Sequence, residues 1–460
     1  MVEREFVRRT ALPHPADRVF AWHARRGALE RLMPPFAPVR VVERSGGIEP
    51  GARVVLRMPV GPAGITWVAE HRDLEPGRLF RDVQVRGPFA RWEHTHRFLP
   101  DGPAASVLED RVSYALPGGV LGDAIGEGFV RAMLGAMFAY RHQVTADDLA
   151  DHAACADGRT ASVLVTGASG LLGSALVPFL TTGGHRVVRL VRGDPVGGLT
   201  PAVSWDPAAG RLEPDSLAGF DAVVHLAGEP VGSARWTEAV KARIRASRVD
   251  GTRLLCETLA GLDRPPRVLV SASAIGIYGD RGDAPCDETA APGAGFLAEV
   301  CRAWEAATEP ARRAGIRVVL LRIGVVLTPR GGALAALLPA FRLGAGGVVG
   351  GGAQWVSWIG LDDVLGAIHH AVDTDAVAGP LNVVAPHPVT NRELTTTLAA
   401  VLCRPALLPV PAVVARLALG ELADEAVLAS TRVVPEKLVG SGYAFRTADL
   451  EGSLRYLLGR

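Results

Sequence analysis

The feature that most constrains this chain is a glycine-rich turn placed between a short apolar strand and a helix. We predict the strand at residues 162–165 and the helix from residue 174, and the turn between them carries Gly167, Gly170 and Gly173. Gly167 permits a tight turn, Gly170 lets the backbone approach a pyrophosphate, and Gly173 allows the helix to pack closely on the strand. The first N–H groups of the helix then favour phosphate binding. The pattern predicts a dinucleotide-binding site.

The end of the next strand, predicted at residues 186–191, indicates which dinucleotide binds. NAD sites usually carry Asp or Glu there to hold the adenosine ribose, but no acidic residue occurs between Ser174 and Gly193. Arg192 stands at that position instead, and a guanidinium pairs well with a 2′-phosphate. Arg189 can assist. We therefore predict NADP rather than NAD, and the alternative is that Arg192 is only a solvated arginine at a strand end.

Short apolar runs alternate with helical segments through the middle of the chain. This rhythm of strand, helix and strand predicts an α/β fold, a Rossmann-type doubly wound parallel sheet over residues 161–378. Residues 379–460 predict a small, mainly helical C-terminal lobe. The apolar runs lie at residues 163–165, 187–191, 222–226, 268–270 and 318–321.

Residues 1–150 follow a different pattern. Polar and apolar residues alternate in several places, as at residues 106–112, which predicts an antiparallel sheet with one covered face. Helices are expected at about residues 16–32 and 122–143, so we predict an α+β helix-grip domain in which the sheet curves around one long helix. A polar, alanine-rich stretch precedes the change of pattern, and we place the linker between domains at residues 151–160.

Composition excludes several classes of protein. A hydrophobic content of 48%, 21% charged residues and a net charge of +1 describe a globular protein with no electrostatic reason to bind nucleic acid or an anionic membrane. Five scattered cysteines without a CxxC pair favour a reducing cytoplasm over an exported, disulfide-linked chain. The first ten residues lack the apolar run of a signal peptide, and Arg416 interrupts the apolar stretch at 406–419. We expect no membrane insertion.

Motifs spread over residues 162–460 resemble the epimerase-like, cell-division-inhibitor-labelled subfamily of extended short-chain dehydrogenases/reductases. The resemblance continues through that family's C-terminal domain of unknown function, at Asn382, Ala385-Pro386, Arg404-Pro405-Ala406, Pro409-Val410-Pro411 and Pro435. The earlier motifs are His225-Leu226-Ala227-Gly228-Glu229-Pro230, Arg235-Trp236-Thr237-Glu238, residues 247–252, residues 271–279, Trp304-Glu305, residues 322–327 and residues 354–359.

The resemblance implies a Rossmann-type fold with NADP and a set of cofactor contacts. The family usually has His after its Trp-Ile pair, whereas Gly360 follows that pair in this chain, so the role of this position does not carry over. Carried over by motif, the cofactor-binding residues are Gly167, Gly170, Leu171, Leu172, Gly173, Arg192, Leu226, Ala227, Gly228, Arg248 and Val326.

The N-terminal region resembles the SRPBCC superfamily of helix-grip domains, which includes START and polyketide-cyclase-like proteins. The resemblance is most specific at residues 87–98, from Gly87 to Phe98. Such domains enclose an apolar cavity for lipids or aromatic compounds, but their functional residues do not transfer. The resemblance therefore implies a fold and an apolar ligand of unknown identity.

The usual catalytic pair of extended short-chain dehydrogenases, Tyr-x-x-x-Lys, is absent. The only lysines are Lys241 and Lys437, and neither follows a tyrosine at this spacing. The remaining candidates for catalysis are Ser273, just after the apolar run at residues 268–270, and Tyr278, which without a cationic neighbour is a poor base. Alternatively these two are a hydrogen-bonded loop serine and a packed tyrosine. Cys301 is a further possible proton donor, although a buried free cysteine is commoner.

Two other groups of residues offer sites that we do not favour. His94 and His96, two apart on a predicted strand, point to one face and can bind a metal with His71 or Glu93. Because Glu93 projects from the opposite face, histidines facing a polar cavity or solvent are the simpler interpretation, and we predict no metal site. Trp355 and Trp358 fit either the wall of a substrate pocket or a core.

Together the patterns predict an NADP(H)-binding, epimerase/dehydratase-like oxidoreductase of unknown small-molecule substrate, fused to a domain that binds an apolar ligand. The missing lysine supports an alternative, a catalytically inactive protein in which NADP(H) acts as a regulator. A third interpretation is a carrier of lipids or aromatic compounds in which the C-terminal part only stabilises the fold.

Overall fold

The computed structural model describes residues 2–60, 63–154, 160–195, 197–232 and 234–460. The described residues form two compact units, one comprising mainly residues 2–154 and the other mainly residues 160–458. We call them the N-terminal unit and the C-terminal unit.

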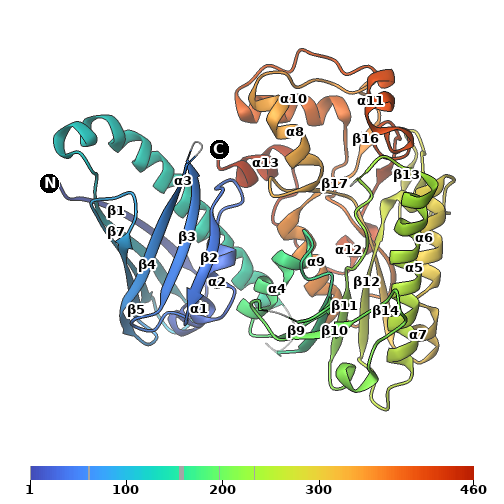
Figure 1. The fold of residues 1–460 in the computed structure, drawn as a ribbon, viewed down its shortest axis with the longest axis horizontal. Helices are drawn as coiled ribbons and strands as arrows, with labels where there is room; N and C mark the ends of the chain where they lie inside the picture. Colours follow the sequence, from blue (N-terminus) through green and yellow to red (C-terminus); the bar gives the residue numbers. More distant parts are fainter. Residues whose placement is uncertain (1, 61–62, 155–159, 196, 233) are drawn as a thin grey trace. The chain divides into compact units, whose positions relative to one another are not determined.

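The N-terminal unit is one seven-stranded antiparallel sheet and a long helix. The strand order is β1-β7-β6-β5-β4-β3-β2, and Figure 1 shows the helix α3 (Gly119–Ala154) lying along this sheet. This arrangement confirms the predicted helix-grip fold. The strands are β1 (Arg4–Leu12), β2 (Arg40–Ser45), β3 (Arg53–Val60), β4 (Ala63–Glu75), β5 (Leu79–Arg86), β6 (Arg91–Pro100) and β7 (Ser106–Ala115).

Helix boundaries in this unit differ from those predicted. The single helix expected at residues 16–32 is two helices, α1 (Ala16–Ala24) and α2 (Ala28–Leu32), because Arg25 is extended and ends the first helix, and Gly27, with a φ of 99°, stands before the second. The helix expected at residues 122–143 continues to Ala154, into the stretch assigned to the linker. Residues 155–159 of that linker, with Cys155, lie outside the described residues.

Alternating side chains of β6 build the interior of the N-terminal unit. Trp92 and Phe98 are buried on the same face of the strand as His94 and His96. Around Trp92 the interior is aromatic, and it is closed by the α3 residue Phe138. One part of this interior is therefore apolar and the next part of the same strand face is polar.

The C-terminal unit is built on a seven-stranded parallel sheet of the order β10-β9-β8-β11-β12-β14-β18. Its buried strands carry continuous apolar runs, as expected of a parallel sheet covered on both faces. This confirms the predicted Rossmann-type fold. The strands are β8 (Ser162–Thr166), β9 (Arg186–Arg192), β10 (Ala202–Trp205), β11 (Ala222–His225), β12 (Val268–Ala274), β14 (Arg317–Ile323) and β18 (Gly379–Val383).

Helices cover both faces of this sheet (Figure 1). The helices α4 (Gly173–Thr182) and α9 (Leu361–Asp373) pack on one face, whereas α5 (Glu238–Ala260) and α7 (Glu309–Arg313) pack on the other. The short α6 (Phe296–Ala306) lies against α5 and places Trp304 in the core of the sheet.

The last strand of the sheet comes from the part of the chain that the sequence pattern assigns to the C-terminal lobe. β18 begins at Gly379 and pairs with β14, so the sheet extends past residue 378. Its apolar run is short and interrupted by Asn382, which hides it from a search for apolar runs. The lobe itself is mainly helical, with α10 (Asn391–Leu402), α11 (Ala412–Leu419), α12 (Glu436–Gly440) and α13 (Leu450–Leu458).

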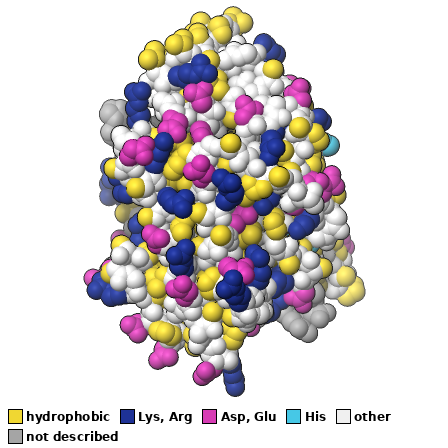
Figure 2. All heavy atoms as spheres, turned by 90° about the vertical axis from the view of Figure 1, so that its right-hand side faces the viewer, with side chains coloured by type: hydrophobic (Ala, Val, Ile, Leu, Met, Phe, Trp, Pro, Cys, Tyr) yellow, Lys and Arg dark blue, Asp and Glu magenta, His cyan; other side chains and the backbone are white. Residues whose placement is uncertain are grey.

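The surface carries both signs of charge. On the face drawn in Figure 2, basic and acidic side chains are interspersed, in agreement with the net charge of +1. Around α11 several large apolar side chains are exposed, including Leu407, Val413 and Leu417. Within the described residues, every helix is too short or too polar to cross a membrane.

Candidate functional site

The candidate site lies where the order of the strands reverses. β8 is followed in the chain by β9 on one side, whereas its other neighbour, β11, is followed by β12 on the opposite side. Connections therefore leave these two strands in opposite directions, and their carboxyl ends are the position at which open α/β sheets bind ligands. Two loops begin there, one with Gly167 after β8 and one with Leu226 after β11.

Glycines are required where these two loops meet. Gly167 adopts a φ of 66°, and a Cβ there would lie 2.6 Å from the carbonyl carbon of Leu226. A Cβ on Gly173 would lie 2.7 Å from the Cα of Ala168 and would collide with the Gly167 carbonyl oxygen. Gly170, in contrast, is exposed, and its N–H donates to the Gly167 carbonyl oxygen at 2.9 Å. The predicted functions of Gly167 and Gly173 thus match the packing around them.

A buried chain of hydrogen bonds fixes both loops. The Thr166 Oγ1 accepts the N–H groups of Leu226 and Ala227 at 3.1 and 3.2 Å. Its own proton is therefore donated to His225 Nδ1, 2.7 Å away. His225 Nε2 in turn donates to Thr252 Oγ1 at 2.9 Å, which also accepts the indole N–H of Trp304 at 2.9 Å.

The electrostatics of this chain require a neutral imidazole. Burial lowers the pKa of His225 to about 4, and among the described residues no charged group raises it. The motif residues His225 and Trp304 therefore act through hydrogen bonds that position the loop after β11. Both residues belong to the sequence motifs, but the motifs alone do not indicate this function.

The two arginines of β9 that were considered for the 2′-phosphate differ in what they contact. Arg192 is exposed at the carboxyl end of β9, at the same edge of the sheet as the glycine turn. Arg189 donates instead to the carbonyl oxygens of Gly197 and Thr200, at 2.5 and 3.1 Å. Its guanidinium therefore holds the loop before β10.

Arg248 supports the loop after β11 from the side of α5. Its Nη1 donates to the carbonyl oxygen of Glu229 at 2.9 Å, and its guanidinium lies 5.0 Å from the ring centre of Trp304. Val326 lies in the short strand β15 (Val325–Leu327), and the segment that follows borders Leu171, since a Cβ on Gly331 would lie 3.0 Å from that side chain. Leu171 and Leu172 are half-buried.

The predicted catalytic serine belongs to a second buried network. Ser273, near the end of β12, is 3% exposed, and its hydroxyl donates to Glu305 Oε1 at 2.8 Å. Arg322 binds the same carboxylate with two nitrogens, Nε at 2.9 Å from Oε1 and Nη2 at 3.0 Å from Oε2. Because Ser273 donates its hydroxyl proton to Glu305, Ser273 Oγ can only accept a hydrogen bond from another group.

Tyr278 lies at the other end of the same network. Its side chain is fully buried, its hydroxyl donates to Asn382 Oδ1 at 2.7 Å, and it accepts from Arg322 Nη1 at 2.9 Å. Burial raises the pKa of Tyr278 despite the opposing effect of Arg322. The expectation that this tyrosine lacks a cationic neighbour was wrong, because Arg322 reaches it from β14, a strand that a search for Tyr-x-x-x-Lys on one helix does not consider.

The remaining candidates have structural surroundings. Cys301 is buried, and burial raises the pKa of its thiol to about 11, so it stays protonated. Trp358 is fully buried and donates to the His387 carbonyl oxygen, whereas Trp355 is half-buried and donates to Asp283. A Cβ on Gly360 would lie 3.3 Å from the Oγ of Ser453, a close contact with a side chain.

The sheet order and the glycine turn define a dinucleotide-binding protein of the Rossmann type. The sequence profile of the NAD dependent epimerase/dehydratase family matches residues 163–384, a domain of unknown function (DUF1731) matches residues 410–457, and the polyketide cyclase/dehydrase and lipid transport family matches residues 12–138. The chain belongs to the NAD dependent epimerase/dehydratase family. The resemblances drawn from its motifs are confirmed.

Named relatives support this assignment. An epimerase family protein of Mycobacterium bovis, Mb2239, is 40% identical over 296 residues, which cover 64% of this chain and 97% of that protein. The human epimerase family protein SDR39U1 is 34% identical over 302 residues, which cover 64% of this chain and 99% of that protein.

Two solved structures resemble the fold. The crystal structure of a nucleoside-diphosphate sugar epimerase from Corynebacterium glutamicum has a TM-score of 0.80 at 35% identity, and the match covers 99% of this chain and 90% of that one. Human SDR39U1 (isoform 2), solved with NADPH, has a TM-score of 0.60 at 32% identity and covers 65% of this chain and 99% of its own. The match to the Corynebacterium protein therefore includes both units, whereas the match to the human protein covers 65% of this chain.

Proposed function

We propose that this protein binds NADP(H) at the carboxyl ends of β8, β9 and β11 and acts as an epimerase-like oxidoreductase on a small molecule. The observation that carries the proposal is the glycine turn at the reversal of strand order, with Arg192 and no carboxylate at the end of β9. The human relative solved with NADPH supports the choice of nucleotide.

The proposed cofactor contacts fall into three groups. The turn residues Gly167, Gly170, Leu171, Leu172 and Gly173 would surround the pyrophosphate through backbone N–H groups and the N-terminus of α4. Arg192 would pair with the 2′-phosphate of NADP. The remaining contacts lie beside the adenosine or behind the loop that meets it, and they are Leu226, Ala227, Gly228, Arg248 and Val326.

Titration of NADPH and NADH into the full chain tests this proposal, followed by intrinsic fluorescence. We expect wild type to prefer NADPH, and Arg192→Ala to weaken NADPH binding about 10- to 100-fold with little change for NADH, since a hydrogen bond to a charged group contributes about 1.5–3 kcal/mol. Arg186→Ala is the matched control, because Arg186 is also exposed but begins β9 at the opposite edge of the sheet. Absence of binding of either nucleotide to wild type would refute the proposal.

The proposed chemistry uses Ser273 together with Glu305. NADP(H), when bound, supplies hydride transfer. A substrate hydroxyl would give its proton to Ser273 Oγ while the serine proton passes to Glu305 Oε1, to which it is already hydrogen-bonded at 2.8 Å. Tyr278, whose hydroxyl is held by Arg322 and Asn382, would be a positioning residue that keeps Arg322 against Glu305.

A substrate screen tests the chemistry. Nucleoside-diphosphate sugars are the first compounds to try, because the Corynebacterium relative is named for them. With any substrate found, Ser273→Ala should lower kcat about 100-fold or more with unchanged NADPH affinity, as expected for loss of a general acid/base step. Cys301→Ser is the control, and equal activity of Ser273→Ala and wild type would contradict the relay.

The regulatory alternative is favoured by one observation, namely that both candidate catalytic hydroxyls already donate their protons within a buried network. In that case NADPH would bind without turnover of any substrate. Hydrogen exchange with and without NADPH then shows protection of the loops after β8 and β11, while every compound of the screen leaves NADPH unoxidised.

We also propose that the N-terminal unit binds an apolar molecule, as its family match to lipid transport and polyketide cyclase proteins suggests. The aromatic interior around Trp67, Trp92 and Phe138 supports this proposal. A polarity-sensitive dye should bind the full chain and be displaced by lipids or aromatic compounds. Trp67→Ala, at a half-buried position, should weaken dye binding, and binding that is unaffected would argue against this pocket.

A further inference from the structure

The most unusual group of buried side chains lies inside the N-terminal unit. His94 and His96 project from the same buried face of β6. Asp82, on the neighbouring strand β5, lies directly opposite His94. A strand face that packs on a core normally carries apolar side chains, because burying polar groups without partners costs free energy. Two imidazoles and a carboxylate in this position therefore require a partner that compensates for burial.

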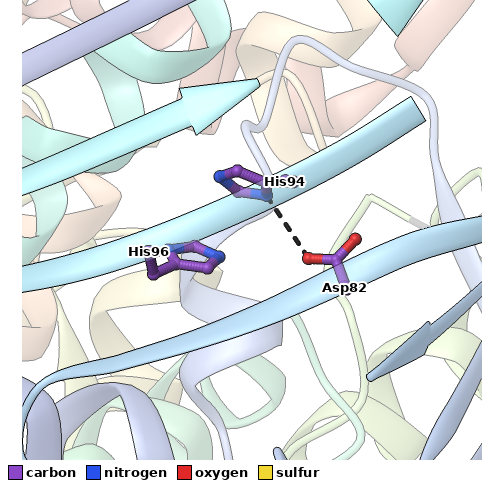
Figure 3. Close-up of side chains that lie close together, drawn as sticks. All are labelled: Asp82, His94 and His96. Atoms are coloured by element: carbon purple, nitrogen blue, oxygen red, sulfur yellow. Dashed lines mark ion pairs between the residues drawn. The ribbon is translucent and has the colours of Figure 1, made fainter. Parts of the chain in front are cut away.

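The three side chains converge. One ligand atom from each of Asp82, His94 and His96 lies within 4.8 Å of the other two, and Figure 3 shows both rings and the carboxylate around a common space. His94 Nδ1 is 3.4 Å from Asp82 Oδ1. Tetrahedral coordination with bonds of about 2.0–2.2 Å separates neighbouring ligand atoms by roughly 3.3–3.6 Å. The observed distance is too long for a good hydrogen bond and matches a pair of metal ligands.

The far side of His94 is oriented by a second carboxylate. His94 Nε2 lies 2.8 Å from Asp110 Oδ1, which leaves Nδ1 directed at Asp82. Asp110 also binds His142 Nε2, at 2.7 Å. A metal-binding histidine typically donates its other N–H to a carboxylate, which fixes the tautomer and the ring orientation. Asp110 provides this support from β7, the strand next to β6.

An unsatisfied nitrogen is a second, independent observation. His96 is only 6% exposed, yet its Nδ1 has no hydrogen-bond partner among the described residues. It lies 2.6 Å from Asp110 Oδ1, but the atoms are not aligned for a hydrogen bond. His71, paired with Asp82 from the other side on β4, has an unsatisfied Nδ1 as well. Buried nitrogens without a hydrogen-bond partner are rare, and here two of them belong to histidines on the strands that flank Asp82.

We propose that Asp82, His94 and His96 bind a divalent transition metal, with Asp110 orienting His94. Imidazole and carboxylate ligands suit Zn²⁺ and its neighbours in the first transition row. Three protein ligands leave coordination positions open, so the ion can also bind an oxygen atom of a small molecule that enters this unit. The sequence alone did not favour a metal, because Glu93 faces away from the histidines and pairs with Arg91 at 2.8 Å, whereas Asp82 comes from another strand.

Titration of tag-free, metal-stripped full-length protein with Zn²⁺ and Co²⁺ tests the proposal. We expect one equivalent of either ion per chain and, for Co²⁺, a visible absorption spectrum typical of nitrogen and oxygen ligands at low coordination number. Zn²⁺ should also slow hydrogen exchange in β5 and β6 and leave β2 unchanged. Wild type without saturable binding, or saturable binding that leaves exchange in β5 and β6 unaltered, would overturn the proposal.

Variants identify the ligands. Asp82→Asn and His96→Gln should each weaken Zn²⁺ binding at least 100-fold, and Asp110→Asn should weaken it about 10- to 100-fold, as is usual for a residue that supports a ligand. The matched control is His387→Gln, which removes an exposed histidine of the C-terminal unit. Unchanged affinity in a folded Asp82→Asn or His96→Gln protein would overturn the assignment. If neither variant folds, the strands in which Zn²⁺ slows hydrogen exchange in wild type show whether the ion binds at β5 and β6.

Discussion

The two units bury polar side chains in different ways. In the C-terminal unit two buried networks at the strand ends are joined by hydrogen bonds: Thr166, His225 and Thr252 form one chain, and Ser273 and Tyr278 are joined through Glu305 and Arg322. In the N-terminal unit the Asp110 carboxylate binds His94 and His142 and lies 2.6 Å from His96 Nδ1, yet the Nδ1 atoms of His71 and His96 form no hydrogen bond among the described residues.

This difference indicates what each network does. A fully satisfied network fixes geometry, and in the C-terminal unit the two networks fix the loops and strand ends that the proposed cofactor would contact. A crowded network with unsatisfied nitrogens indicates that a further group completes it, which is the basis of the proposed metal site. The following predictions test this contrast, beginning with the largest effect.

Removal of the central carboxylate should have the largest effect. Asp110→Ala leaves buried His94 and His142 without their acceptor and removes the charge next to His96, so we expect the metal-free N-terminal unit to lose about 3–5 kcal/mol of unfolding free energy. Urea unfolding followed by hydrogen exchange assigns the loss to this unit. Asp73→Ala is the matched control, because Asp73 forms an exposed pair with Arg81 and should contribute less than about 1 kcal/mol. Equal effects of both substitutions would show that Asp110 is not central.

Because His225 is buried as a neutral imidazole, we expect the free energy of unfolding of the C-terminal unit to depend on pH. Its pKa is about 4 when folded and about 6.5 when unfolded, so the unfolded chain takes up the proton first as the pH falls. The free energy of unfolding should therefore decrease by about 3 kcal/mol between pH 6.5 and pH 4 because of this group, with no effect above that range. Wild type and His225→Gln are compared by unfolding at several pH values. The two pH profiles should differ by this amount, and parallel profiles would contradict a neutral, buried His225.

The variant Tyr278→Phe tests whether the Tyr278 hydroxyl stabilises the buried network or contacts the cofactor. The substitution removes one donor and one acceptor from a satisfied network, so we expect a loss of about 1–2 kcal/mol of unfolding free energy. NADPH affinity should stay within about twofold of wild type, because the hydroxyl contacts Asn382 and Arg322 instead of the proposed nucleotide site. A large loss of NADPH affinity, with little change in stability, would place Tyr278 at the cofactor.

The smallest effect is expected for Arg189. Its guanidinium is occupied by loop carbonyl oxygens, so Arg189→Ala should lower stability by about 1 kcal/mol and leave the ratio of NADPH to NADH affinity unchanged. Arg192→Ala should show the opposite behaviour. A change of nucleotide preference in Arg189→Ala would mean that the loop before β10 rearranges when the nucleotide binds.

The sequence predicted the folds and the glycine turn because their signals are local. Gly167, Gly170 and Gly173 lie within seven residues of each other, and the alternation of β6 is visible within one strand. Contacts between side chains on strands far apart in the sequence could not be predicted from these local patterns. Arg322 reaches Tyr278 across 44 residues, and Asp82 faces His94 only because β5 and β6 pair in one register. Pairing register depends on the whole sheet, which a single sequence does not specify.

The long-range contacts of the N-terminal unit also bear on how it folds. β1 pairs with β7, so that Arg4 lies opposite Tyr114, and Thr10 contacts His142 across 132 residues. In the C-terminal unit, β8 pairs with β9 only 24 residues later. During synthesis, the N-terminal sheet must wait for its last strand and its interior must wait for α3, whereas the first strand, helix and strand of the C-terminal unit can form as soon as they emerge. We expect slow closure of the N-terminal unit to limit folding of the nascent chain.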